Sequence, residues 1–376
     1  MKIAYTTTYD ADNIHNWSGL GYYIAQALKL HHELDYIGNL TFKPTKTQKF
    51  KRKIYNYLGK EFDYSRETNI ARQYALQIEQ KLKMDHDVVF SPGTLPIAHL
   101  RTQKPISFYT DATFAGMLGY YKEFSQFSVE TIRHGNSLEQ KALDNCDVAI
   151  YASHWAAKTA LENYRVDASK IKVVPFGANV SIELDYSSLS GIIEQKSDVI
   201  CNLLFIGVDW VRKGGDKAVE IAKQMNKRGI CTNLHVVGIP KIPIDDIPAF
   251  VINHGFISKS TEAGVYKLKN LFEICHFLVV PTMAEAYGLV FCEANANGIP
   301  ALSHITGGVS TIIENDINGK LFSFEDDVND WVNYLCSVFI NKSFYSQMCF
   351  QSLNKYQSIF NWSTAGESIS SILKAL

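Results

Sequence analysis

The sequence lacks several features that mark whole classes of protein. Its seven cysteines are scattered and contain no C-x-x-C pair, which argues against a zinc site or a disulfide framework. No apolar run reaches the length of about 18 residues that a transmembrane helix needs, and MKIAYTTTYD does not resemble a signal peptide. The 37 basic residues are balanced by 38 acidic ones, whereas a nucleic-acid binder is usually strongly basic. We therefore expect a cytoplasmic protein that does not bind nucleic acid.

What the sequence has is a regular alternation of short apolar runs and helix-period segments. Runs such as KIAYTTTY, DVVFSPG, LLFIG and FLVVPT are typical of buried parallel strands, and segments such as GDKAVEIAKQMNKRG are typical of the helices that connect them. The strands are too many for one ordinary doubly wound sheet, and the polar stretch 181–198 interrupts the pattern. The sequence therefore predicts an α/β fold with Rossmann-like domains at 1–180 and 199–357, a linker at 181–198, and a C-terminal helix within 358–376.

Residues 279–300, VVPTMAEAYGLVFCEANANGIP, carry the strongest functional signal. A predicted strand is followed by Gly288 and then by a predicted helix, whose free N–H groups and partial positive charge would attract a phosphate. Glu285 precedes this helix and Glu293 lies on it. Two carboxylates beside an anion site can each accept hydrogen bonds from the vicinal hydroxyls of a sugar. Taken alone, such a pair is more often a loop residue and a surface helix charge.

The same segment resembles the donor-site signature of the family 4 glycosyltransferases, which have the GT-B fold. That signature is glutamate, seven residues, glutamate, then A-x-A-x-G-x-P, and here it is EAYGLVFCE followed by ANANGIP. VPFGAN, LLFIGVDWVRKGGDKAV and ITGGVSTIIENDINGKLF are similar to further parts of that family, and the likeness is weakest between residues 40 and 85. The resemblance implies two domains that face each other across a cleft, with the C-terminal helix returning to the first.

The resemblance also implies an activity. The protein would be a retaining, metal-independent hexosyltransferase that moves a sugar from a UDP- or GDP-sugar to a hydroxyl of a glycan or a lipid-linked acceptor, as in cell-surface polysaccharide synthesis. No other cofactor is implied. Two alternatives stay open: a sugar-nucleotide epimerase or phosphorylase of the same fold, and a catalytically silent glycan-binding partner of another transferase.

Roles at the donor site follow from the family's motif. Glu293 would hold the ribose hydroxyls and Glu285 would contact the transferred sugar. The backbone amides at the start of the predicted helix, at Gly288, Leu289 and Val290, would hold the diphosphate.

A second donor-site element is the loop in VDWVRKGGDK, where Arg212 and Lys213 lie between a predicted strand and a helix. A cation there can meet a diphosphate, although an isolated R-K-G-G is more often a solvated turn. By resemblance Lys213 pairs with the donor phosphates. The family often has an arginine directly after the strand glycine, but here Val208 follows Gly207, so Arg212 would have to supply that charge.

In the first domain the candidates are fewer. Gly19, in NWSGLGYY, resembles the family's glycine loop near donor and acceptor, although a lone G-x-G is equally consistent with an ordinary helix entry. Asp111 ends a predicted strand and is a candidate ligand for an acceptor hydroxyl. Many relatives have a histidine just before this aspartate, where this chain has Thr110. His134 is a second acceptor-side candidate, but a helix histidine with satisfied hydrogen bonds is the more common case.

Residues 41–60, TFKPTKTQKFKRKIYNYLGK, combine six lysines and one arginine with aromatic and aliphatic side chains and contain no acidic residue. Two interpretations stay open. The segment is either a solvated, mobile loop or a peripheral docking surface for an anionic membrane or a lipid-linked phosphate.

Overall fold

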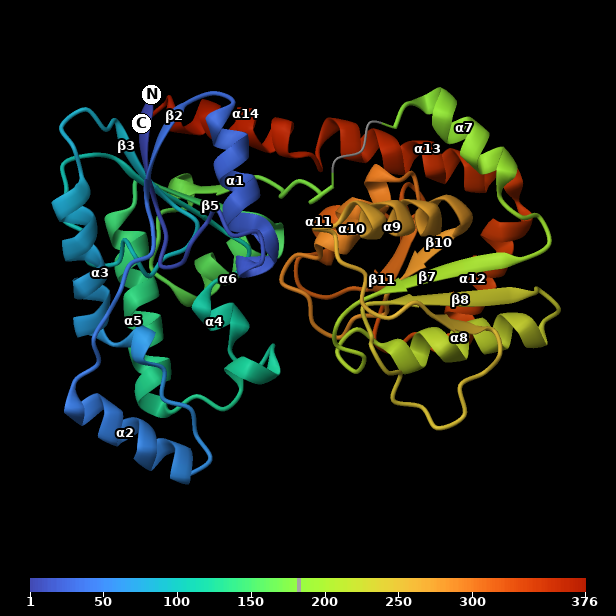
Figure 1. Ribbon diagram of the computed structural model, residues 1–376, viewed down its shortest axis with the longest axis horizontal. Helices are drawn as coiled ribbons and strands as arrows, with labels where there is room; N and C mark the ends of the chain where they lie inside the picture. Colours follow the sequence, from blue (N-terminus) through green and yellow to red (C-terminus); the bar gives the residue numbers. More distant parts are fainter. Residues whose placement is uncertain (181–183) are drawn as a thin grey trace. The chain divides into compact units, whose positions relative to one another are not determined.

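The computed structural model describes residues 1–180 and 184–376, which form two compact units. The first unit contains residues 1–179 and 362–376, and the second contains 180–361. Each is built on a parallel six-stranded sheet flanked by helices (Figure 1). The predicted Rossmann-like α/β fold is therefore confirmed. No helix among the described residues is long and apolar enough to cross a membrane.

The first sheet has the strand order β2-β1-β3-β4-β5-β6, with every pair parallel. Its strands are β1 (Lys2–Thr6), β2 (Glu33–Ile37), β3 (Val88–Ser91), β4 (Ile106–Thr110), β5 (Val148–Tyr151) and β6 (Ile171–Val173). The chain adds β2 on one side of β1 and β3 on the other. Ligands of open α/β sheets commonly bind beyond the carboxyl ends of the strands at such a reversal of strand order.

The helices of the first unit include the last helix of the chain. They are α1 (Leu20–Lys29), α2 (Lys46–Tyr57), α3 (Thr68–Lys81), α4 (Phe114–Met117), α5 (Val129–Asn145), α6 (His154–Asn163) and α14 (Trp362–Leu373), with 3-10 turns η1 (Asn16–Gly19), η2 (Tyr64–Arg66), η3 (Lys122–Phe124) and η4 (Ala168–Lys170). α14 lies against α1: the rings of Trp362 and Tyr23 stack at 6.0 Å. A Cβ on Gly366 would lie 2.7 Å from the Ala27 carbonyl oxygen, so only glycine permits this close approach.

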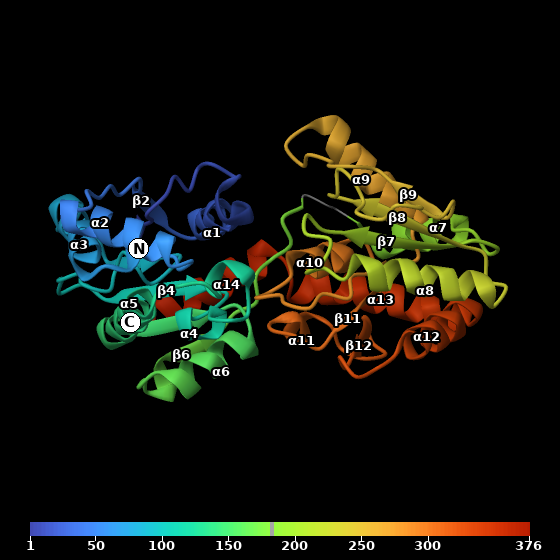
Figure 2. The same ribbon diagram turned by 90° about the horizontal axis from the view of Figure 1, so that it is seen from below.

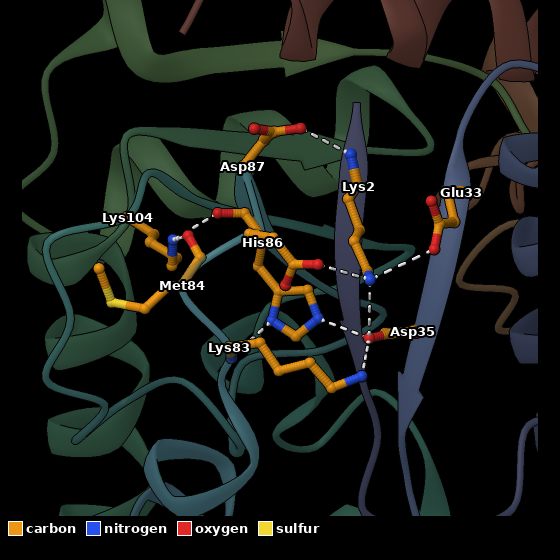
Figure 3. Close-up of polar contacts among 9 residues, drawn as sticks. Lys2, Glu33, Asp35, Lys83, Met84, His86, Asp87 and Lys104 are labelled. Carbon is orange, nitrogen blue, oxygen red and sulfur yellow. Dashed lines mark hydrogen bonds and ion pairs between the residues drawn. The ribbon is translucent and has the colours of Figure 1, made fainter.

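Charged side chains hold together the amino-terminal ends of the first three strands (Figure 3). The Lys2 ammonium contacts Asp85 at 2.9 Å and Glu33 at 3.3 Å. Asp35 accepts from Lys83 at 2.6 Å and lies 2.9 Å from His86 Nε2. These hydrogen bonds, that of Lys83 first, lower the pKa of Asp35 to about 2. The cluster lies at the opposite end of the sheet from the loops that follow its strands, so we assign it a structural role.

The second sheet has the order β12-β11-β10-β7-β8-β9, again parallel throughout. Its strands are β7 (Cys201–Ile206), β8 (Thr232–Val237), β9 (Val251–Asn253), β10 (Phe277–Val279), β11 (Ala301–His304) and β12 (Gly319–Phe322). Here the order reverses between β7 and β10. Figure 1 shows α8 on one side of β7 and β8, and α9 and α10 on the other.

The remaining helices are α7 (Tyr186–Gln195), α8 (Gly215–Lys227), α9 (Glu262–Ile274), α10 (Leu289–Ala296), α11 (Val309–Ile312), α12 (Val328–Ile340) and α13 (Lys342–Ser358), several of which are visible from below in Figure 2. α7 occupies most of the segment 181–198 that we expected to be a linker. Residues 181–183 of that segment lie outside the described part of the chain. Asp185 caps the helix by accepting from the Ser188 N–H, and Leu189 is fully buried in the core of the second unit. The sequence did not predict this amphipathic helix because the segment is mostly polar and only one of its side chains, Leu189, is fully buried.

Candidate functional site

The candidate site of the second unit lies where its strand order reverses, at the loops that follow β7 and β10. Two glycines let these loops pack closely. A Cβ on Gly207 would lie 2.8 Å from Lys213 Cγ, so the lysine stem runs directly over this glycine. Gly214 has φ +76°, and a Cβ there would lie 2.1 Å from the Pro281 carbonyl oxygen. The backbone thus sets Lys213 beside the loop that carries Glu285.

Three of the predicted site residues form one cluster. The Lys213 ammonium makes an ion pair with Glu285 Oε2. Arg212 Nη1 lies 3.5 Å from the same oxygen and donates to the Ala284 carbonyl at 2.8 Å. The side chains of Lys213 and Glu285 are only 10% and 12% exposed, so their attraction is screened less than that of a surface pair. Both cations contact the Glu285 carboxylate, and Arg212 Nε also lies 3.6 Å from Asp209 Oδ2, so the two positive charges are balanced by two carboxylates that an anion could replace.

The start of α10 adds a positive potential beside these two cations. Gly288 is the N-cap of the helix with φ +104°, and as a glycine it has no side chain of its own to cap the first N–H groups. The first N–H groups of a helix have no partner within the helix, and they carry the positive end of its dipole. A Cβ on Gly288 would lie 3.2 Å from Glu285 Cγ, which places the glutamate next to this helix start. Leu289 is partly exposed and Val290 is buried at the first turn.

Glu293 is not a surface helix charge. It is 2% exposed on α10, and its Oε1 pairs with the ammonium of Lys259, whose side chain is 41% exposed. Sequence reasoning missed Lys259, which lies in the loop between β9 and α9 and belongs to no recognised motif. The pairing gives a buried carboxylate an opposite charge as its partner, and that partner is itself partly exposed.

In the first unit a cavity of about 270 Å³ lies at the reversal point of the sheet, beyond β1, β3 and β4. Asp111 lines it, as expected for a residue that directly follows β4. Glu139, which sequence reasoning missed, also lines it and is 2% exposed. Its Oε2 accepts from Thr94 Oγ1 at 2.6 Å, whereas its Oε1 has no hydrogen-bond partner among the described residues. Burial raises the pKa of Glu139 and outweighs the opposing effects of Thr94, Arg66 and the Phe114 N–H.

The other candidates of the first unit have structural surroundings. Gly19 has φ +81° and is the N-cap of α1, so its helix-entry role is evident in the structure. His134 does not line the cavity with Asp111. Its Nδ1 lies 2.6 Å from Glu67 Oε1. Glu67, Glu130 and His134 offer ligand atoms within 4.8 Å of one another, but Lys51 already pairs with Glu130 and balances its charge.

Comparison with known proteins identifies the second unit, which contains the cluster of Lys213, Arg212 and Glu285. Residues 202–349 match the family model "Glycosyl transferases group 1". The chain is 25% identical over 214 residues to a D-inositol 3-phosphate glycosyltransferase of Gordonia bronchialis, a match that covers 52% of this chain and 45% of that protein. The chain spans about half the length of the curated relatives it matches.

Solved structures resemble the whole chain. A sucrose-phosphate synthase from Thermosynechococcus elongatus superposes with a TM-score of 0.70 at 15% identity, covering 100% of this chain and 98% of that one. Anabaena HepE in complex with UDP and glucose gives a TM-score of 0.65 at 14% identity, with both chains covered in full. At such low identity these likenesses establish the fold. The segment matched by the family model contains Arg212, Lys213, Glu285 and Glu293.

Proposed function

We propose that the protein is a retaining hexosyltransferase that uses a UDP- or GDP-sugar, on the premises that residues 202–349 match the family model of the group 1 glycosyl transferases and that the chain has the GT-B fold. The observation that carries the proposal is the cluster of Lys213, Arg212 and Glu285 beside the start of α10, whose N-cap is Gly288. It combines cations for a diphosphate with a carboxylate for a sugar hydroxyl.

Without substrate, Glu285 neutralises part of the charge of Lys213 and Arg212. When the donor binds, its diphosphate takes these cations and the N–H groups at Gly288, Leu289 and Val290, with Gly207 leaving room for the lysine stem. Glu285 then turns to a hydroxyl of the transferred sugar. Glu293 exchanges its contact with Lys259 for the ribose hydroxyls.

The cations act on the chemical step because negative charge develops on the leaving diphosphate. The bond from the anomeric carbon to the phosphate oxygen breaks, and a bond from that carbon to the acceptor oxygen forms on the same face of the sugar. The acceptor proton passes to the departing phosphate oxygen, so no protein base is required. Lys213, Arg212 and the helix dipole take the part that a divalent metal would play, which is why we propose metal independence.

We place the acceptor in the first unit, where Asp111 and Glu139 line the cavity together with threonines and several aromatic side chains. Two carboxylates beside several threonine hydroxyls suit a polyhydroxyl compound better than an apolar one. The proposed class is a glycan or lipid-linked sugar. D-inositol 3-phosphate, in the name of the curated relatives, is likewise a polyhydroxyl compound. A lipid-linked acceptor would bring the enzyme to the surface of a membrane, and residues 41–60 have the composition for a peripheral contact there.

A two-part experiment tests the proposal. The first part is thermal unfolding of the full chain with UDP-, GDP- and ADP-sugars, in which a donor at 100 times its Kd should stabilise the protein by about 2.7 kcal/mol. The second part measures release of the nucleoside diphosphate with and without a sugar acceptor. Release that needs the acceptor supports transfer. Epimerised donor without release would instead identify an epimerase, and stabilisation by none of the donors would contradict donor binding.

A further inference from the structure

α2 is a fixed helix and not the mobile loop that the sequence allowed. Thr45 and Gln48 form a capping box at its start, in which each side chain accepts from the other's backbone N–H. The Gln48 amide also donates to Asn69 Oδ1 at 2.6 Å and to Glu67 Oε2 at 3.2 Å. The helix therefore begins at a defined residue and is attached to α3 there.

Three further contacts fix which face of α2 points inward. Lys51 pairs with Glu130, the second residue of α5. The Tyr55 ring stacks on Phe62 at 5.6 Å with an interplanar angle of 6°. The Arg52 guanidinium lies 5.0 Å from the centre of the Tyr64 ring. Figure 1 shows the helix at the periphery of the first unit, beside the start of α5. Its rotation about its own axis is thus set by neighbours.

With that rotation, the outward face carries a row of large apolar side chains, which we call the α2 ridge. It consists of Phe50, Ile54, Tyr57 and Leu58, which are 64%, 43%, 91% and 62% exposed. Phe50, Ile54 and Tyr57 are separated by four and three residues and therefore share one face of the helix, and Leu58 is the C-cap residue that follows Tyr57. Single exposed apolar residues are normal on soluble proteins, but a contiguous row of four marks a contact surface.

Charges of one sign surround the α2 ridge. Lys46, Lys49, Lys53 and Lys60 are all exposed, and no acidic residue occurs between positions 41 and 60. In the described ranges 1–180 and 184–376 none of these four lysines pairs with a carboxylate. The net charge of the whole chain is only −1, so this concentration is local and not a consequence of a basic protein.

We propose that α2 docks the first unit onto an anionic lipid surface, with the helix parallel to the surface. The α2 ridge enters the boundary between headgroups and acyl chains, with the Tyr57 hydroxyl remaining at headgroup level, and the four lysines meet the lipid phosphates. Charge complementarity and an apolar face on the same side of one helix are what an interfacial helix needs, whereas a polyanion without an apolar phase would leave the ridge in water. This inference goes beyond the proposed transferase activity and does not depend on it.

Sedimentation of the full chain with vesicles tests the inference. Wild-type protein should sediment with vesicles that contain phosphatidylglycerol and not with phosphatidylcholine alone. Binding should fall steeply with salt, because the Debye length shrinks from about 10 Å at 0.1 M to about 3 Å at 1 M. A charge variant (Lys46, Lys49, Lys53 and Lys60 to Gln) and a ridge variant (Phe50, Tyr57 and Leu58 to Ser) should each bind at least tenfold more weakly.

A matched control changes the same number of charges elsewhere. Lys29, Lys81, Lys158 and Lys172 are exposed lysines of the first unit outside α2, and their replacement by Gln should leave vesicle binding unchanged. The position of the helix is read from Tyr57→Trp, whose fluorescence should shift to the blue on anionic vesicles. Leu30→Trp, at an exposed site at the end of α1, should not shift. No sedimentation, equal loss in the control, or equal binding to neutral vesicles would overturn the inference, whereas nucleotide binding should be the same in every variant.

Discussion

Lys213 and Glu285 lie 72 positions apart in the chain and form an ion pair in which both side chains are nearly buried. Each lies in the loop that follows one of the two strands between which the second sheet reverses its order, β7 or β10. The pair therefore follows from the topology, which brings two motifs that are separate in sequence into one site.

Removal of the lysine should reduce turnover more than it changes folding. Lys213→Ala should lower kcat by about 10²–10³, or ~2.7–4 kcal/mol, the usual loss of one group that stabilises a developing anion. Steady-state rates and a circular dichroism spectrum check this together. Arg212→Ala, which leaves the Lys213–Glu285 pair intact, should cost less. Wild-type turnover in folded Lys213→Ala would rule out the diphosphate role.

The two glutamate variants should differ in their affinity for the free nucleotide, measured by calorimetry. Glu293→Ala should weaken binding of UDP or GDP because its proposed partner is ribose, by ~1.5–3 kcal/mol for a charged hydrogen bond. Glu285→Ala should leave that binding nearly intact and reduce transfer, since its proposed partner is the sugar. Equal effects of both variants on the free nucleotide would contradict this division.

Replacement of Gly207 by alanine should disturb the site by displacing the side chain of Lys213. Gly207→Ala brings a Cβ to within 2.8 Å of Lys213 Cγ, so the ammonium must move, and we expect at least a tenfold loss of kcat/KM for the donor. Gly191→Ala is the matched control, since nothing lies within 4 Å of its Cβ and the site is inside α7. That change should leave the rate unaltered and stabilise the protein by roughly 0.5–1 kcal/mol.

The cavity that we propose for the acceptor predicts a change in one kinetic constant, the KM for the acceptor. Glu139→Gln should raise the KM for the acceptor about tenfold or more, the effect of weakening a hydrogen bond to a charged group, without changing the KM for the donor. Ser107→Ala is the control: its hydroxyl is also buried without a hydrogen-bond partner among the described residues, but it does not line the cavity. An unchanged acceptor KM in Glu139→Gln would remove this residue from the site.

The second unit should lose stability in mild acid through His276. Burial, and to a lesser extent Lys196, lower the pKa of this histidine to about 4. Its Nδ1 accepts from the Asn202 N–H at 3.1 Å and its Nε2 lies 3.0 Å from the Ser197 carbonyl oxygen, an arrangement that a neutral ring satisfies. The unfolded chain binds a proton near pH 6.5 and the folded one does not. Stability is therefore full above that value and falls as the pH drops towards 4, by up to about 3 kcal/mol. Urea unfolding at pH 7 and pH 5 measures this loss, which should be smaller in His276→Gln.

Sequence patterns predicted the elements whose periodicity is strong. The buried strands and the helix after Gly288 follow from continuous β-branched runs and from a glycine at a helix start, and the structure has both. The α7 and α2 helices were not predicted, because their apolar residues are few and their polar composition is typical of loops. In α2 the capping box between Thr45 and Gln48 was the signal that could have revealed it.

Residues that act through distant neighbours could not be predicted. Lys259 pairs with Glu293 across 34 positions, and Glu139 reaches Thr94 across 45, and neither spacing belongs to a local pattern. For His134 the partner Glu67 is equally remote, so only the structure could show that this histidine is engaged away from the cavity. The sequence does not determine which side chains of different helices and loops contact each other, because those contacts depend on how the helices pack on the sheet.

α14 has a consequence for the order in which the chain becomes structured. It is synthesised after the second unit, yet it packs on α1 of the first unit, so residues 180–361 are inserted within the first unit. During synthesis the second unit has all of its residues before the first one does, and the face of α1 that receives Trp362 stays open until α14 has been made. Nascent chains released before residue 362 should therefore hold a folded second unit and an incomplete first unit that is open to proteases and chaperones.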